Sequence, residues 1–92
     1  MLKDFLERAV EMGADAVEIE YEDGEEIVYA VRGSTGLGIG SVPAAQRATL
    51  FSDLRRLKKA KAVTLSGQRY RLSFSERESF GETLYRIALK RG

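Results

Sequence analysis

Two stretches in which apolar and polar residues alternate constrain the fold of this 92-residue chain more than any other feature. The first contains three apolar residues separated by glutamates, namely Val17, Ile19 and Tyr21. A period of two is typical of a strand with one buried face, here with an acidic outer face. Asp23-Gly24 fits the hairpin turn that should follow, because a type I′ turn needs positive φ at both central residues. The alternation resumes over residues 27–32, so the sequence predicts an antiparallel hairpin.

The second alternating stretch has a basic outer face. Its apolar residues are separated by Arg69, Arg71 and Ser73, and they are Tyr70, Leu72 and Phe74. A short strand around residues 63–65 should precede it, with a turn at residues 66–68. Residues 75–79 are polar, and we expect a loop there.

Helical periodicity occurs twice. Apolar residues three and four positions apart predict a helix over about 2–12, ending near Gly13, and they are Leu2, Phe5, Leu6, Ala9 and Val10. A second stripe at Leu50, Phe51, Leu54 and Leu57 predicts a helix over about 44–60, opened by Pro43. The glycine-rich residues 33–42 between hairpin and helix are interpreted as an irregular connection. The alternative, a phosphate-binding loop, is less well supported because Leu37 and Ile39 interleave with the glycines.

The last segment has two interpretations. Ser79-x-x-Glu82 fits a capping box that opens a helix, whereas Thr83, Tyr85, Ile87 and Leu89 alternate as in a strand. Periodicity leaves both open. The sequence predicts an α+β fold in a single domain over residues 1–92. Two helices should pack on one face of a largely antiparallel sheet of about five strands.

The absence of cysteine and histidine excludes much chemistry. A chain without them has no disulfide, no thiolate nucleophile, no zinc ribbon and no Ser-His-Asp triad. The acid pairs Asp23/Glu25 and Glu76/Glu78 lack the dense spacing of a calcium loop. We therefore expect no catalytic, cofactor-binding or metal-binding residues. The mixed charges of residues 1–8 do not resemble a signal peptide, and no run reaches the ~20 apolar residues of a membrane span. A cytoplasmic protein without membrane insertion is expected.

The net charge of +1 conceals an asymmetry. Residues 1–33 carry ten acidic and three basic side chains, whereas residues 34–92 carry four acidic and twelve basic ones. This division fits either a basic ligand-binding face or two halves that neutralise each other. We favour the second reading. It predicts that Arg69, Arg71 and Arg86 pair with Glu18, Glu20 and Glu22 across one face of the sheet.

Further basic residues lie on the predicted helix, namely Arg55, Arg56, Lys58, Lys59 and Lys61. They could contact nucleic-acid phosphates, but the nearby aromatic Phe51 belongs to the apolar stripe. A solvated helix face is the simpler interpretation. The candidate interaction residues of the whole chain are Arg55, Arg56, Lys59, Arg69, Arg71 and Arg86.

Two segments carry a family resemblance. The first is Gly13-Ala14-Asp15-Ala16-Val17-Glu18-Ile19-Glu20, followed by a strand ending in Arg32-Gly33. The second is Gly67-Gln68-Arg69-Tyr70-Arg71-Leu72-Ser73, followed by Gly81-Glu82 and Arg86-Ile87. Together they resemble the second N-terminal domain of type II secretion and type IV pilus assembly ATPases. That domain is PAS-like and precedes the ATPase core.

The resemblance covers about 13–89 and implies a strand for residues 82–89, which gives the order α-β-β-α-β-β-β. Arg71 and Arg86 stand where that family has arginines that can approach nucleotide on the adjacent core. The motif G-x-x-x-x-G-K-[ST] does not occur, so the resemblance implies a detached or truncated accessory domain. We expect a non-catalytic protein-interaction or regulatory domain whose partner is a secretion component, a pilus component or a second copy. The alternative is a small nucleic-acid-binding module that uses the basic helix 44–61.

Overall fold

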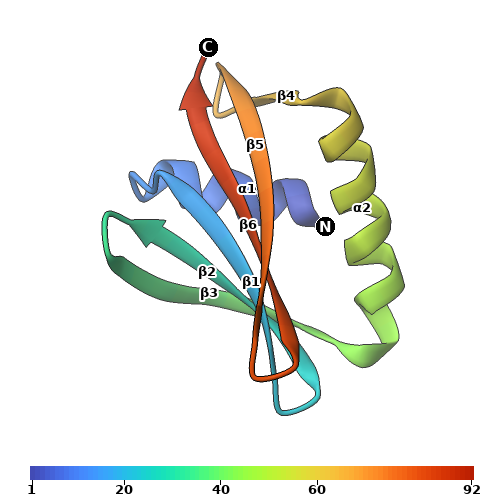
Figure 1. The fold of residues 1–92 in the computed structure, drawn as a ribbon. Helices are drawn as coiled ribbons and strands as arrows, with labels where there is room; N and C mark the ends of the chain where they lie inside the picture. Colours follow the sequence, from blue (N-terminus) through green and yellow to red (C-terminus); the bar gives the residue numbers. More distant parts are fainter.

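A computed structural model describes residues 1–92, except for the side chain of Ser79. The elements follow in the order α1 (Leu2–Glu11), β1 (Ala16–Glu22), β2 (Glu25–Arg32), β3 (Thr35–Pro43), a short 3-10 helix (Ala44–Gln46), α2 (Arg47–Ala60), β4 (Ala62–Leu65), β5 (Gln68–Ser79) and β6 (Glu82–Arg91). The strands form one antiparallel sheet in the order β3-β2-β1-β6-β5-β4 (Figure 1). The predicted α+β class is confirmed, but the sheet has six strands rather than about five.

Both helices cover the same face of the sheet. The apolar stripe of α1 is buried, and so are Leu50 and Leu54 of α2. These side chains join one core with inward residues of the central strands, including Val17, Ile19 and Ile87. In Figure 1, α1 crosses behind the strands and α2 lies along one side of them. We call this side of the sheet the helix face and the other side the open face.

The register of the strands decides which side chains reach each face. Val17 lies between Ala30 of β2 and Ile87 of β6, all three on the helix face. Residues one position along the strands point the other way, so Glu18 and Arg86 lie on the open face. The alternating charges of the sequence therefore mark the open face, as predicted.

The stretch 33–42 is not an irregular connection. Gly33, with φ +60°, begins the turn between β2 and β3, and β3 pairs with β2 from Thr35 to Pro43, with a register shift at Ile39. The ring of Tyr29 lies beside Gly36 and Gly38, where a Cβ atom on either glycine would be 3.8–4.0 Å from it. An aromatic ring laid over edge glycines supplies the packing that the glycines lack. This strand is not evident from the sequence, because glycines and uncharged residues show no alternation of apolar and polar side chains.

Residues 75–79 are also not a loop. They continue β5 to Ser79, opposite the first residues of β6, and both residues of the tight turn Phe80-Gly81 have positive φ. The strand reading of residues 82–89 is confirmed. The predicted second helix begins later than expected, because residues 44–46 form a 3-10 turn ahead of Arg47. No helix in the described part of the chain combines the length and apolarity needed to cross a membrane.

Candidate functional site

The six candidate interaction residues lie on two separate surfaces. Arg55, Arg56 and Lys59 are exposed on α2, which covers the helix face. The register places Arg69 and Arg71 of β5 and Arg86 of β6 on the open face. The structure therefore brings together the strand arginines but does not bring them to the helix cations.

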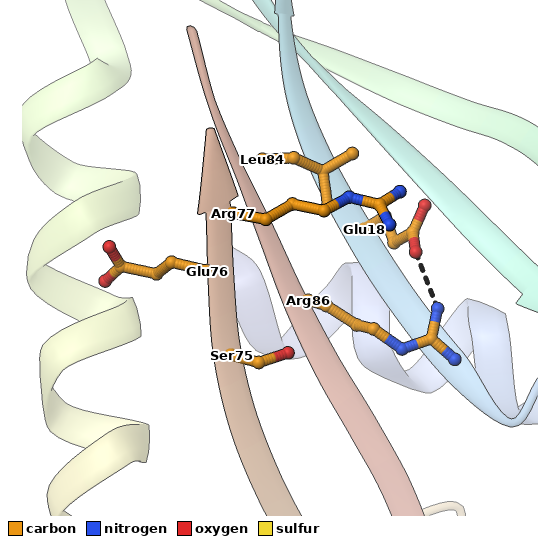
Figure 2. A pocket seen from close by; sticks show the side chains of 6 residues that line it. All are labelled: Glu18, Ser75, Glu76, Arg77, Leu84 and Arg86. Atoms are coloured by element: carbon orange, nitrogen blue, oxygen red, sulfur yellow. Dashed lines mark hydrogen bonds and ion pairs between the residues drawn. The ribbon is translucent and has the colours of Figure 1, made fainter. Parts of the chain in front are cut away.

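The open face contains one well-formed ion pair. Nη1 of Arg86 donates a hydrogen bond of 2.6 Å to Oε2 of Glu18, its direct neighbour on β1. Figure 2 shows Arg77 of β5 extending over the sheet on the same side as this pair. Together with Ser75, Leu84 and Glu76, these side chains line a shallow cavity of about 270 Å³.

The predicted cross-strand pairing is confirmed only for Glu18 and Arg86. Among the described side chains, no ion pair within 4.0 Å includes Arg69 or Arg71. The reason is the strand order. β6 lies between β5 and β1, so two strand spacings, roughly 9.5 Å, separate those arginines from the β1 glutamates. Arg71 instead lies directly opposite Lys90, which concentrates positive charge at this end of the open face.

Glu22 on β1 has a different partner. The hydroxyl of Tyr29 donates a short hydrogen bond to Oε2 of Glu22. This bond holds the phenol in its neutral form. Together with desolvation and the charges of Glu22 and Glu20, it raises the pKa of Tyr29 to about 12. Two of the β1 glutamates on the open face thus have side-chain partners: Arg86 for Glu18 and the phenol of Tyr29 for Glu22.

On α2, two of the cations have acidic neighbours. Arg56 donates to Oδ1 of Asp53, and Nζ of Lys58 lies 4.0 Å from Oε1 of Glu76. Burial alone raises the pKa of Asp53, but other contacts outweigh it and leave that pKa below its ordinary value. These are the N–H of Leu2, the terminal ammonium and the guanidinium of Arg56. Arg55 and Lys59 are in no ion pair among the described side chains, which leaves them as the exposed, unpaired candidate cations of α2.

The edge strand β3 is a candidate site that no sequence pattern indicates. β3 is nine residues long, carries no charged side chain and forms one free edge of the sheet. Its Leu37 is 56% exposed. Edge strands of monomeric proteins are usually protected by charge, proline or a bulge. In β3 such protection is confined to the second half. A register shift leaves Ile39 unpaired between Gly38 and Gly40, the carbonyl of Ile39 accepts from Arg8, and Pro43 ends the strand.

A second unexpected feature is a carboxylate on the helix face. Glu26 of β2 is only 2% exposed, and its Oε2 atom accepts no hydrogen bond from the described residues. Nε of Arg47 is 3.7 Å away, which is close enough for charge attraction but too far for a hydrogen bond. The sequence contains one indication of this buried carboxylate, the consecutive Glu25 and Glu26. In a strand, neighbouring side chains point to opposite faces, so one of the two must face inward.

Burial has the largest effect on the pKa of Glu26. It raises the pKa of this carboxyl, while Arg47 lowers it and Glu82 raises it further. Glu26 lies at a cavity of about 230 Å³ that is also lined by Tyr21, Tyr85, Arg47, Glu82 and Thr83. Among the described residues, no group of three or more acidic side chains is placed to hold a metal ion.

Neither a scan against models of protein families nor a search of the curated proteins gives a match for this chain.

Proposed function

We propose that this chain is a non-catalytic protein-interaction domain, related to the N-terminal domain of secretion and type IV pilus ATPases, and that it binds partners by strand addition at β3. The observation that carries the proposal is the uncharged, exposed edge over residues 35–38. Such an edge offers backbone N–H and C=O groups to the strand of another chain. The partner is a secretion or pilus component or a second copy of this chain, in the cytoplasm.

The geometry of the turn identifies the outward backbone groups. Arg32 and Thr35 flank a two-residue turn, so they exchange hydrogen bonds with each other. In an antiparallel ladder the next pair does not, and Gly36 therefore directs its N–H and C=O away from β2. An added strand would bond there without disturbing the sheet.

A single residue can test this pairing. Gly36→Pro removes the outward N–H but leaves the bonds to β2 intact, since proline is tolerated on the outer side of an edge strand. Gly36→Ala is the matched control, because it adds a Cβ atom in ordinary contact with Tyr29 and Val31 and keeps the N–H. We expect the parent and Gly36→Ala to self-associate in sedimentation, or to retain the same secretion or pilus component from the source cell. We expect Gly36→Pro to do neither.

Circular dichroism should show that all three proteins are folded. The proposal is wrong if Gly36→Pro binds as the parent does. It is equally wrong if the folded parent neither self-associates nor captures a secretion or pilus component.

A second candidate function is nucleic-acid binding through helix α2. The observation in its favour is the exposed position of Arg55 and Lys59 on the outer side of α2. The placement of Arg69 and Arg71 on the other side of the sheet weakens it, because one duplex would not reach both groups. A titration with single- and double-stranded oligonucleotides at low salt decides the matter. Binding that weakens with salt and with Arg55→Gln/Lys59→Gln would support this function.

A further inference from the structure

The cavity beside Glu26 combines three features that bear on what it could bind. A carboxylate that is almost completely buried has an oxygen without a donor among the described residues. Two tyrosines, Tyr21 and Tyr85, line the same cavity. A second carboxylate, that of Glu82, also lines it. Burying a charge without hydrogen bonds is costly. A ligand that donated a hydrogen bond to this oxygen would remove part of that cost.

Arg47 shows what kind of group suits this place. Its guanidinium carbon lies 5.7 Å from the ring centre of Tyr21 and 5.3 Å from that of Phe51. Phe51 in turn packs against Tyr85, with ring centres 5.0 Å apart. A cation at these distances is attracted by the aromatic faces. The side chain of Arg47 nevertheless remains 54% exposed, and its Nε atom, 3.7 Å from Oε2 of Glu26, is too far away for a hydrogen bond.

The charges around the cavity do not balance. Glu26 and Glu82 carry two negative charges, and Arg47 supplies one positive charge. A further cation would bring the group to neutrality. The cavity has a volume of about 230 Å³, which is below the roughly 300–1,000 Å³ usual for pockets that bind whole small molecules. The cavity therefore suits a group of side-chain size.

We propose that the cavity formed by Tyr21, Glu26, Glu82 and Tyr85 is a binding site for the guanidinium group of an arginine side chain or of a small guanidino compound. A guanidinium is planar, stacks on aromatic rings and presents several N–H donors to a carboxylate. It meets both requirements of the site, since one N–H satisfies Oε2 of Glu26 while the plane lies against the tyrosine rings. A quaternary ammonium group has no N–H donor and leaves Glu26 unsatisfied.

The site does not depend on strand addition at β3, so each can fail without the other. The ligand can come from a polypeptide or from solution, and the two sources are distinguished by probe. The probes are a blocked peptide with one central arginine, agmatine, the same peptide with citrulline, and choline. Citrulline keeps the shape of arginine without its charge, and choline has charge without donors.

Binding is measured by NMR titration of the amide signals. We expect the arginine peptide or agmatine to shift signals of residues around Tyr21, Glu26, Thr83 and Tyr85. Whichever binds more tightly identifies the source. Citrulline peptide and choline should bind at least about tenfold more weakly. Gly36→Pro should bind like the parent, which separates this site from the edge strand.

Two substitutions test the assignment of roles. Glu26→Gln removes the buried charge with little change of shape, and it should weaken guanidinium binding at least about tenfold. Arg47→Gln removes the resident cation and should strengthen binding several-fold. The proposal is wrong if neither the parent nor Arg47→Gln binds a guanidinium probe. It is also wrong if the citrulline peptide or choline binds equally well, or if Glu26→Gln leaves the affinity unchanged.

Discussion

Glu18 and Glu26 occupy opposite faces of the same sheet, and each lies near one arginine, but their surroundings differ. Glu18 on the open face accepts a 2.6 Å hydrogen bond from Arg86, its register neighbour. Glu26 on the helix face is more deeply buried, and Arg47 lies 3.7 Å from it without a hydrogen bond. The partner of Glu18 is fixed by strand pairing, whereas the partner of Glu26 is supplied by the first residue of α2.

The difference shows how the two faces are organised. The one ion pair of the open face among the described side chains, Glu18–Arg86, is partly exposed to water, so it contributes little to stability. On the helix face, the packing of α1 and α2 against the sheet determines stability. A buried carboxylate there, such as that of Glu26, depends on a side chain of a helix for a hydrogen-bond donor. The stability of the fold should therefore be sensitive to changes on the helix face and tolerant of changes on the open face.

The largest expected effect is at Leu54 on the helix face. Leu54 is buried in the core against the sheet. Leu54→Ala should lower the free energy of unfolding by about 2–5 kcal/mol, because it removes apolar contacts and leaves a cavity. Ser73→Ala on the open face is the control and should change it by less than about 0.5 kcal/mol. Urea unfolding measures both. Equal stability of the two variants would contradict the division between the faces.

Two glycines of β3 allow the same comparison within one strand. A Cβ atom on Gly40 would lie 2.5 Å from Cε1 of Phe5, an α1 residue in the core, whereas one on Gly36 would touch nothing closer than 4.0 Å. Gly40→Ala should therefore cost about 1–3 kcal/mol of stability, as overpacked cores do. Gly36→Ala should be neutral or stabilise by about 0.5 kcal/mol, because alanine loses less conformational freedom on folding. Thermal unfolding of the two variants tests this, and a stable Gly40→Ala would show that Phe5 repacks freely.

The two glutamates give the next smaller effect, with opposite signs. Glu26→Gln removes a buried charge whose Oε2 has no donor, and it should stabilise the fold at neutral pH by about 1 kcal/mol. Glu18→Gln should destabilise it by about 0.2–1 kcal/mol, the range for a partly exposed ion pair. A loss of stability in Glu26→Gln would indicate that attraction to Arg47 outweighs the cost of burial.

The pH dependence provides an independent check on Glu26. Its pKa in the folded protein lies above the ordinary value, so between these two pKa values the folded state binds more protons than the unfolded state. The free energy of unfolding should therefore fall as the pH rises through this window, and the contribution should be fully present below the ordinary pKa. Glu26→Gln should lose that part of the slope. The same slope in both proteins would contradict the raised pKa.

The sequence predicted the fold wherever a residue pattern reports burial. The alternation at Val17–Tyr21 and Tyr70–Phe74 identified strands and their outer charges, and the stripe at Leu50 and Leu54 identified the buried side of α2. It failed at β3, where packing comes from Tyr29 of the neighbouring strand and not from the residues of β3 themselves. It also failed at residues 75–79, where β5 continues and the polar side chains of residues 75–78 are exposed.

The candidate sites were less predictable than the fold, because they depend on strand order. Sequence alone placed Arg69, Arg71 and Arg86 opposite the β1 glutamates, but only the strand order shows that β1 is bordered by β2 and β6 and not by β5. The cavity at Glu26 combines residues from β1, β2, β6 and α2. No local pattern connects such residues, and a single glutamate beside another in a strand does not reveal which one is buried.

The smallest expected effect concerns Tyr29, whose hydroxyl donates to Glu22 at the edge of the open face. The pKa of Tyr29 in the folded protein is about 12, so this residue should ionise about two pH units above an ordinary tyrosine. Glu22→Gln should move that titration back towards about 10 while changing stability by less than about 1 kcal/mol at neutral pH. Alkaline ultraviolet titration, with Tyr29→Phe to identify the signal, measures the shift. A normal titration of Tyr29 in the parent would mean that its hydroxyl does not donate to Glu22 in solution, and the tyrosine that lies beside Gly36 and Gly38 would then lack this tie to β1.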